Sequence, residues 1–241
     1  MNYFKAAELA PRGADSFAFS DLWQLPQPVR EQALAEVPEV EREAALGGDE
    51  QARRRVVRAL FWPLVYHLAP RRWDALSRAE PIHPGVLAAL PADGCRVMEI
   101  GAGSGRLTAH LMIRAAEVVA IEPAAPLREL FRARLPSVTV LPGEAARIPL
   151  PDHWAGLSVA CAALAPDAEC LKEIERCTQP SGTIAFISPE EPEWLESRGF
   201  RRLRFDAREV AIPDHDPGIE EFFGELDPPH EILLRLAGNP R

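Results

Sequence analysis

Three glycines, Gly101, Gly103 and Gly105, separate a short apolar run from a helix-like segment in the stretch VMEIGAGSGRLT. Glycine adopts positive φ without strain and has no Cβ that would hold a ligand away from the backbone. A helix that begins behind such a turn also has free amide N–H groups in its first turn. These residues predict a turn that binds a polar small molecule against the main chain.

The spacing of these glycines narrows the class of ligand. A dinucleotide fingerprint reads GxGxxG, whereas GAGSGR has Arg106 where the last glycine is expected, which weakens a nicotinamide interpretation. Glu122 ends the next apolar run, where a carboxylate can accept both hydroxyls of an adenosine ribose. The pattern therefore favours an adenosine ligand that lacks a pyrophosphate.

A series of short apolar runs must position these residues. Runs that are apolar throughout their length indicate strands buried on both faces, as in a parallel sheet covered by helices. We predict strands over 96–100, 117–122, 137–141, 156–163 and 182–188. Helices are expected between them over 104–116, 123–135 and 166–177, while 142–155 is mostly loop. This alternation indicates a doubly wound α/β fold.

The two ends of the chain differ from this central pattern. After a short helix over 192–199, we predict strands over 200–206 and 230–236, separated by a long acidic loop. Residues 1–84 lack convincing strands and are expected to form a helical extension, with Pro63 kinking its third helix or beginning a new one. The predicted domains are therefore a helical extension over 1–84 and a ligand-binding domain over 85–241.

Composition excludes several classes of protein. The net charge of −9 over 241 residues disfavours binding to a nucleic-acid backbone. The basic clusters at 53–58 and 71–72 are either solvated helix faces or local anion sites. The four cysteines form no CxxC pair, so neither a zinc site nor a disulfide framework is expected. No run predicts a signal peptide or a membrane span, and we expect a cytoplasmic protein without membrane attachment.

Four segments together carry a resemblance to a known family. VMEIGAGSGRLT, VVAIEP, LPGEAARIPLPD and LKEIERCTQPSGTIAFISP stand in the order and spacing of the class I S-adenosylmethionine-dependent methyltransferases. The resemblance covers about residues 85–205. It implies S-adenosyl-L-methionine as cofactor and a Rossmann-like, doubly wound, mostly parallel seven-stranded sheet with an antiparallel last strand. Residues 1–84 match no motif of this family.

The resemblance also implies roles for particular residues. Glu122, followed by Pro123, would bind the ribose, Glu144 would face the adenine amino group, and the N–H of Ala145 would meet a ring nitrogen. Glu99 and Glu144 are alternatively exposed carboxylates that cap a helix end, and Glu122 is alternatively a plain surface acid. Gly105 alternatively serves helix packing. The residues expected around the methionine part, and at the boundary between cofactor and acceptor, are Glu99, Gly101, Ala102, Gly103, Gly105, Ala160 and Cys161.

Methyl transfer from a sulfonium needs chiefly alignment and exclusion of water, because the leaving group is a neutral thioether. Where the acceptor is a hydroxyl or an ammonium, a base must take its proton, and histidine is best matched to that task near neutral pH. His83, just ahead of the first strand, is the first candidate and His67 the second, although both are alternatively structural. No acid cluster follows the fourth strand, so no metal site is predicted.

Our main hypothesis is a methyltransferase acting on oxygen or nitrogen of a small organic acceptor. The aromatic residues at 61–73 either form a lid that lines an acceptor pocket or pack the extension onto the sheet. The loop with Phe222 and Phe223 is a candidate to complete such a pocket. Three alternatives remain at this point: a protein or RNA methyltransferase, a non-catalytic protein that binds the cofactor for regulation, and a nicotinamide-dependent dehydrogenase.

Overall fold

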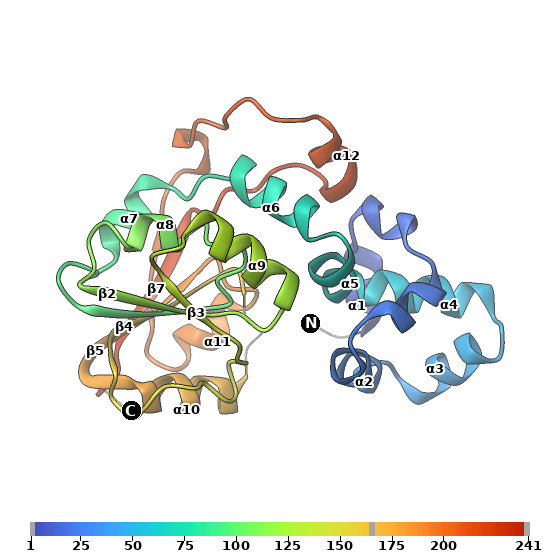
Figure 1. Cartoon of the computed structure of the whole chain (residues 1–241), viewed down its shortest axis with the longest axis horizontal. Coiled ribbons are helices and arrows are strands. Elements are labelled where there is room, and N and C mark those ends of the chain that lie inside the picture. Colours follow the sequence, from blue (N-terminus) through green and yellow to red (C-terminus); the bar gives the residue numbers. More distant parts are fainter. Residues whose placement is uncertain (1–2, 164–166, 239–241) are drawn as a thin grey trace. The chain divides into compact units, whose positions relative to one another are not determined.

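The structure, a computed structural model, describes residues 3–163 and 167–238. Contacts between residues group the chain into two compact units (Figure 1). The first, which we call the helical unit, ends at Leu76 and also includes Asp214–Leu226. The second, the sheet unit, comprises Ser77–Pro213 and the chain from Asp227 onward. This grouping differs from the expected boundary at 84/85, since the segment before the first strand belongs with the sheet.

The sheet unit contains one seven-stranded sheet with the strand order β3-β2-β1-β4-β5-β7-β6. Neighbouring strands are parallel except that β7 runs antiparallel to both β5 and β6. The predicted seven-stranded, doubly wound sheet with an antiparallel last strand is confirmed. Its strands are β1 (Arg96–Ile100), β2 (Glu117–Ile121), β3 (Thr139–Leu141), β4 (Ala155–Cys161), β5 (Thr178–Ile187), β6 (Arg201–Arg204) and β7 (Glu231–Leu236).

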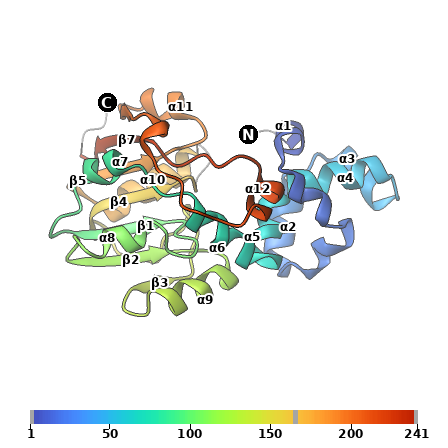
Figure 2. The same cartoon turned by 90° about the horizontal axis from the view of Figure 1, so that it is seen from above.

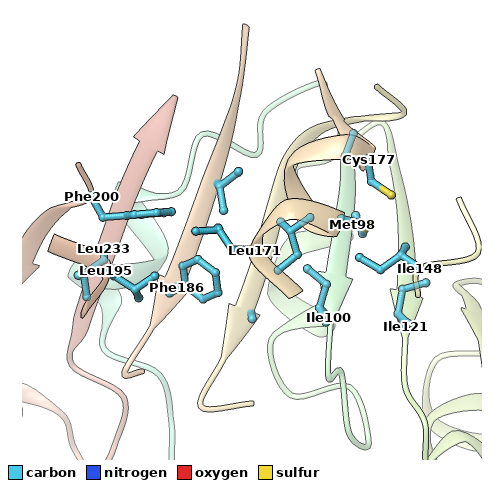
Figure 3. Packing of buried hydrophobic residues seen from close by; sticks show 14 of the residues in the cluster. Met98, Ile100, Ile121, Ile148, Leu171, Cys177, Phe186, Leu195, Phe200 and Leu233 are labelled. Atoms are coloured by element: carbon cyan, nitrogen blue, oxygen red, sulfur yellow. The ribbon is translucent and has the colours of Figure 1, made fainter. Parts of the chain in front are cut away.

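Helices cover both faces of this sheet, as Figures 1 and 2 show. Along β1, Met98 and Ile100 face a core that includes Leu171, Ile174 and Leu195 of α10 and α11 (Figure 3). Val97 faces the opposite core with α7 and α8, and α9 packs on that same side through Phe131. The continuous apolarity of the strands thus reflects burial on two sides. The helices are α7 (Pro84–Ala89), α8 (Thr108–Leu111), α9 (Ala125–Arg134), α10 (Ala168–Cys177) and α11 (Pro192–Glu196), with a 3-10 turn η3 (Ala207–Glu209).

The helix behind the glycines is shorter than predicted. We expected it over 104–116, but α8 spans only Thr108–Leu111. Gly101, Gly103 and Gly105 have φ of 67°, 56° and 92°, so the chain is still turning where the helix was expected to begin. A residue with positive φ cannot belong to a right-handed helix. For the helix expected over 166–177, Pro166 lies outside the described residues, and α10 begins at Ala168 with Asp167 as its N-cap.

The helical unit is built mainly on α4. Val56 and Val57 of α4 are buried with Leu22 and Ala45 in one apolar core. The expected break near Pro63 is confirmed, because one helix ends at Ala59 and another begins at Phe61. The elements are α1 (Tyr3–Leu9), η1 (Arg12–Ser16), η2 (Phe19–Gln24), α2 (Gln27–Ala35), α3 (Glu39–Leu46), α4 (Glu50–Ala59), α5 (Phe61–Leu68), α12 (Gly218–Phe223), and α6 (Pro70–Ala79), which continues into the sheet unit.

The acidic loop predicted between the last two strands contains α12, and its residues 214–226 pack within the helical unit. Phe222 of α12 is buried beside Ala14, Phe61 and Val65 in a second apolar core. These aromatic residues therefore pack against one another within the helical unit, whereas packing of the extension onto the sheet stays a prediction. None of the described helices is long and apolar enough to cross a lipid bilayer.

Candidate functional site

The glycine turn begins where β1 ends, between neighbours β2 and β4. The strand order reverses at β1, and ligands of open α/β sheets bind at such a switch point. The N–H groups of Gly101 and Ala102 donate to the carbonyl oxygen of Ile121 at 2.8 and 3.2 Å. The last peptide of β2 therefore fixes the start of the turn.

The side chain of Glu122 connects the end of β2 to the same turn by hydrogen bonds. One carboxylate oxygen accepts the N–H of Gly103 at 2.8 Å, and the other accepts the N–H of Ala124, also at 2.8 Å. The side chain is buried, and this burial raises the pKa of Glu122 while the two backbone hydrogen bonds oppose the rise. A carboxylate has about four lone-pair positions, so two acceptor positions remain. That is the number required by the two hydroxyls of a ribose.

Glu99, on β1, is a second buried carboxyl close to the turn. It is 2% exposed, and Thr108 at the start of α8 donates a hydrogen bond to it. Burial is the main cause that raises its pKa to about 8, and Thr108 and Arg106 oppose the rise. Near neutral pH this carboxyl therefore retains its proton in the protein alone. A cationic group placed beside it would favour the ionised form.

A cluster of polar groups adjoins the glycine turn on the β4 side. Nη1 of Arg106 donates to the Glu80 carboxylate at 3.2 Å and to the Glu80 carbonyl oxygen at 3.1 Å. Nη2 of Arg106 lies 3.7 Å from Sγ of Cys161 at the end of β4. The other carboxylate oxygen of Glu80 accepts the N–H of Asp227 at 3.1 Å. Burial raises the pKa of Glu80, opposed by the hydrogen bonds from Asp227 and Arg106.

This cluster was missed from the sequence. Arg106 was noted only as a departure from the dinucleotide pattern, and nothing near Glu80 signalled its contact with the turn. A second missed contact joins Ser77 and Ser104, whose hydroxyl oxygens lie 3.1 Å apart in a buried position. Both contacts join the segment before α7 to the glycine turn.

At positions 101 and 105, a side chain larger than that of glycine would also collide with neighbouring residues. A Cβ on Gly101 would lie 2.4 Å from the Cβ of Ala163, in the segment that follows β4. A Cβ on Gly105 would lie 2.7 Å from Leu135, beside Phe131 of α9. Close packing therefore accounts for glycine at position 105, and contact of its backbone with a cofactor stays a prediction.

The remaining predicted cofactor residues lie at the carboxyl ends of β2, β3 and β4, the same edge as the glycine turn. Pro123 is exposed directly after Glu122, and Glu144 is exposed in a turn closed by a 3.0 Å hydrogen bond from the N–H of Arg147 to its carbonyl. Ala145 is partly buried against the core, while Ala160 is 2% exposed within β4. The topology brings these residues to one edge, and their individual roles stay predictions.

The two candidate histidines occupy different settings. His83 is the N-cap of α7, where its Nδ1 accepts the N–H of Gly85 at 2.9 Å. Its buried ring stacks on Phe205, and Nε2 lies 3.5 Å from a Glu209 carboxylate oxygen, too far for a good hydrogen bond. Capping and stacking give His83 a structural use, and its catalytic role stays a prediction. His67 belongs to α5 in the helical unit.

These residues fit an adenosyl sulfonium cofactor. Glu122 retains two acceptor positions at the switch point, and the carboxyl of Glu99 lies in the strand that enters the turn. Acidic groups suit a ligand that carries a sulfonium and an ammonium group, since opposite charges attract strongly in buried surroundings. Within the described residues, no group of three or more histidine, cysteine, aspartate or glutamate side chains could hold a metal ion.

Comparison with known proteins agrees with this geometry. Residues 98–186 match the family model described as a methyltransferase domain. An uncharacterized methyltransferase of Mycobacterium tuberculosis, strain H37Rv, is 32% identical over 117 residues, which cover 47% of this chain and 48% of that protein. An uncharacterized methyltransferase of Schizosaccharomyces pombe is 34% identical over 95 residues, 38% of each chain. The chain thus spans about half the length, or less, of these relatives.

The fold of this chain is also similar to that of a solved structure. This chain is similar to one protein in a solved complex from Haloferax volcanii, which pairs the Trm112 methyltransferase activator with a protein described as a methyltransferase. The TM-score is 0.53 and the sequence identity is 18%. The match covers 72% of this chain and 95% of that one. Three observations agree: the strand order, the glycine turn that Glu122 holds by a hydrogen bond from Gly103, and the matched family model. Residues 98–186 match a methyltransferase domain, and the sheet unit has the strand order and glycine turn of the class I S-adenosylmethionine-dependent methyltransferase fold.

Proposed function

We propose that this protein transfers a methyl group from S-adenosylmethionine to oxygen or nitrogen of a small organic acceptor. The observation that carries the proposal is the position of Glu122. Its carboxylate is held by the N–H groups of Gly103 and Ala124, and two of its acceptor positions are left for a ribose. This acid and the glycine turn are parts of one hydrogen-bonded unit at the switch point of the sheet.

In this proposal, the residues of the protein bind the cofactor and orient it towards the acceptor. Glu122 fixes the ribose, and the turn from Gly101 to Gly105 sets the position of the methionine part. The cofactor supplies a methyl group already activated by its sulfonium. Ala160 and Cys161, at the end of β4, would border the acceptor and help to exclude water from the transfer. For an acceptor that must lose a proton, His83 and His67 remain the candidate bases.

A small acceptor has more support than RNA. In the basic cluster at 53–58, Arg53 pairs with Glu50, Arg55 with Glu41 and Arg58 with Asp15. These ion pairs neutralise most of the charge that a phosphate backbone would need, in a chain whose net charge is −9. A protein or RNA acceptor is therefore the second candidate.

Turnover assays separate these functions. Purified protein is incubated with S-adenosylmethionine and panels of small alcohols, phenols and amines, of RNA and of proteins, and release of S-adenosylhomocysteine is measured by mass spectrometry. We expect release with at least one small acceptor and its loss in Glu122→Ala, while Glu129→Ala, at an exposed position of α9, retains it. Release only with RNA or protein would favour the second candidate. Cofactor binding without release in any panel would indicate a non-catalytic binding protein.

A further inference from the structure

A separate groove lies within the helical unit. It has a volume of about 630 Å3, in the range of pockets that hold small molecules. Its walls come from η1, from the start of α6 and from α12. The residues that matter for its chemistry are Arg12, Ser16, Arg71, Arg72, Phe222 and Phe223.

The arginines of this groove differ from those of the other basic cluster. Across residues 3–163 and 167–238, the side chains of Arg12 and Arg71 form no hydrogen bond or ion pair, and the guanidinium of Arg72 only stacks on the ring of Phe222 at 4.4 Å. Arg53, Arg55 and Arg58 each have a carboxylate partner instead. Two acids, Asp216 and Glu221, also line the groove, which leaves an excess of one positive charge from three arginines.

The placement of Arg71 and Arg72 does not favour the stability of the helix. Both lie in the first turn of α6, which has no acidic residue there. The positive end of the helix dipole repels cations in that turn. Two guanidinium groups and the helix end thus create a positive potential at one wall of the groove, where an anion would be stabilised.

The groove also has aromatic side chains that are packed against neighbouring residues. Phe222 is 7% exposed, and a Cβ on Gly13 would lie 2.6 Å from its ring, so η1 packs directly on the phenyl group. Phe223 packs face to face with Trp62, with ring centres 6.2 Å apart. The groove therefore combines guanidinium groups that lack a carboxylate partner with packed aromatic side chains.

We infer that this groove binds a small organic acid, with its carboxylate held by Arg12 and Arg71 and its apolar body against the aromatic rings. A guanidinium presents a planar set of donors that matches the two oxygens of a carboxylate. The inference does not rest on the proposed methyl transfer, because its observations all concern residues of the helical unit and its test uses no cofactor.

Calorimetric titration with benzoate, in low salt and without cofactor, tests this inference. We expect saturable binding that weakens as salt is added. Arg12→Ala/Arg71→Ala should weaken it at least about tenfold, which corresponds to about 1.4 kcal/mol. Neither side chain has a partner to lose, so circular dichroism and melting temperature should stay unchanged. The matched control is Arg54→Ala, an exposed arginine of the same unit that lines another groove, and it should bind benzoate as the wild type does.

Two further probes define the recognition. Benzamide has the same ring without the charge and should bind at least about tenfold more weakly than benzoate. Inorganic phosphate has charge without a ring and should also bind more weakly. Absence of benzoate binding, equal binding of benzamide, or equal loss in Arg54→Ala would each overturn the inference. Tighter binding of phosphate than of benzoate would contradict the aromatic part of the site.

Discussion

Two buried carboxyls near the glycine turn have different surroundings and different uses. Glu122 accepts two backbone N–H groups, which stabilise its ionised form, whereas Glu99 accepts one hydroxyl from Thr108. Burial raises the pKa of both carboxyls, and at Glu99 it raises the pKa to about 8. Residues of one chemical type, 23 positions apart in the sequence (122 − 99 = 23), therefore serve as an anchor and as a buried acid.

The first prediction concerns the pH dependence of stability caused by Glu99. The folded protein retains this proton up to about pH 8, whereas the unfolded chain loses it near the ordinary value of 4.5. The stabilising contribution is therefore fully present below about pH 4.5 and is lost as pH rises towards 8. Relative to Glu99→Gln, the wild-type free energy of unfolding should fall across this window, with a slope of up to about 1.4 kcal/mol per pH unit.

Urea unfolding from pH 5 to pH 8 measures that difference. Glutamine retains an acceptor for Thr108 and cannot ionise, so it isolates the titration. Glu129→Gln, on the exposed side of α9, should differ from the wild type by a constant amount. A difference between wild type and Glu99→Gln that does not vary with pH would show that Glu99 does not titrate in this window.

Sequence patterns predicted the residues of the turn better than their partners. The glycines, Glu99 and Glu122 were identifiable because a strand, a turn and a second strand leave strong local signals. The contacts of Arg106 with Glu80 and of Ser104 with Ser77 join positions about 26 residues apart, and they depend on how the segment before α7 packs. Such packing has no periodic signature in the chain.

At the scale of elements, the strands were predicted well because burial on both faces requires continuous apolar runs. β1 has the predicted bounds, Arg96–Ile100. α8 was predicted too long because the apolar spacing of 104–116 gives no sign that Gly105 keeps a positive φ. α12 was read as loop, since GIEEFF is one short helical segment in a stretch rich in proline and acid.

The second prediction compares Gly105 with another glycine of positive φ. Gly105→Ala places a Cβ 2.7 Å from Leu135 at a φ of 92°, whereas Gly94→Ala, at a φ of 66°, meets nothing within 4 Å. The Gly94 variant should lose about 1 kcal/mol from backbone strain alone. The Gly105 variant should lose about 1–3 kcal/mol more, because α9 must move. Equal losses in chemical unfolding would show that packing of α9 on the turn is unimportant.

At the scale of the whole molecule, the helical unit includes a segment from late in the chain. Residues 214–226 lie between β6 and β7 in the sequence but belong to the helical unit. Their Phe222 is buried in a core with Ala14, Phe61 and Val65. The sequence indicated a helical extension and marked Phe222 as notable. It contained no local signal that joins these distant segments, because that contact is made by side-chain packing alone.

The third prediction tests this arrangement. Phe222→Ala should destabilise the helical unit by about 3–5 kcal/mol, the usual loss for a buried phenylalanine. Hydrogen exchange followed by mass spectrometry should show lost protection in α5, with β1 and β4 unchanged. Phe4→Ala, whose side chain is 57% exposed, is the matched control and should change little. Unchanged protection of α5 in Phe222→Ala would place residues 214–226 outside that core.

Calorimetric titration with S-adenosylmethionine measures directly whether the glycine turn and Glu122 bind this cofactor. The wild type should bind one molecule per chain, and Glu122→Ala should bind at least about tenfold more weakly, a loss of about 1.4 kcal/mol. Glu122→Gln should also lose affinity, and circular dichroism confirms that both variants remain folded. Folded wild-type protein that does not bind S-adenosylmethionine, or a folded Glu122→Ala variant that binds it with wild-type affinity, would contradict the assignment.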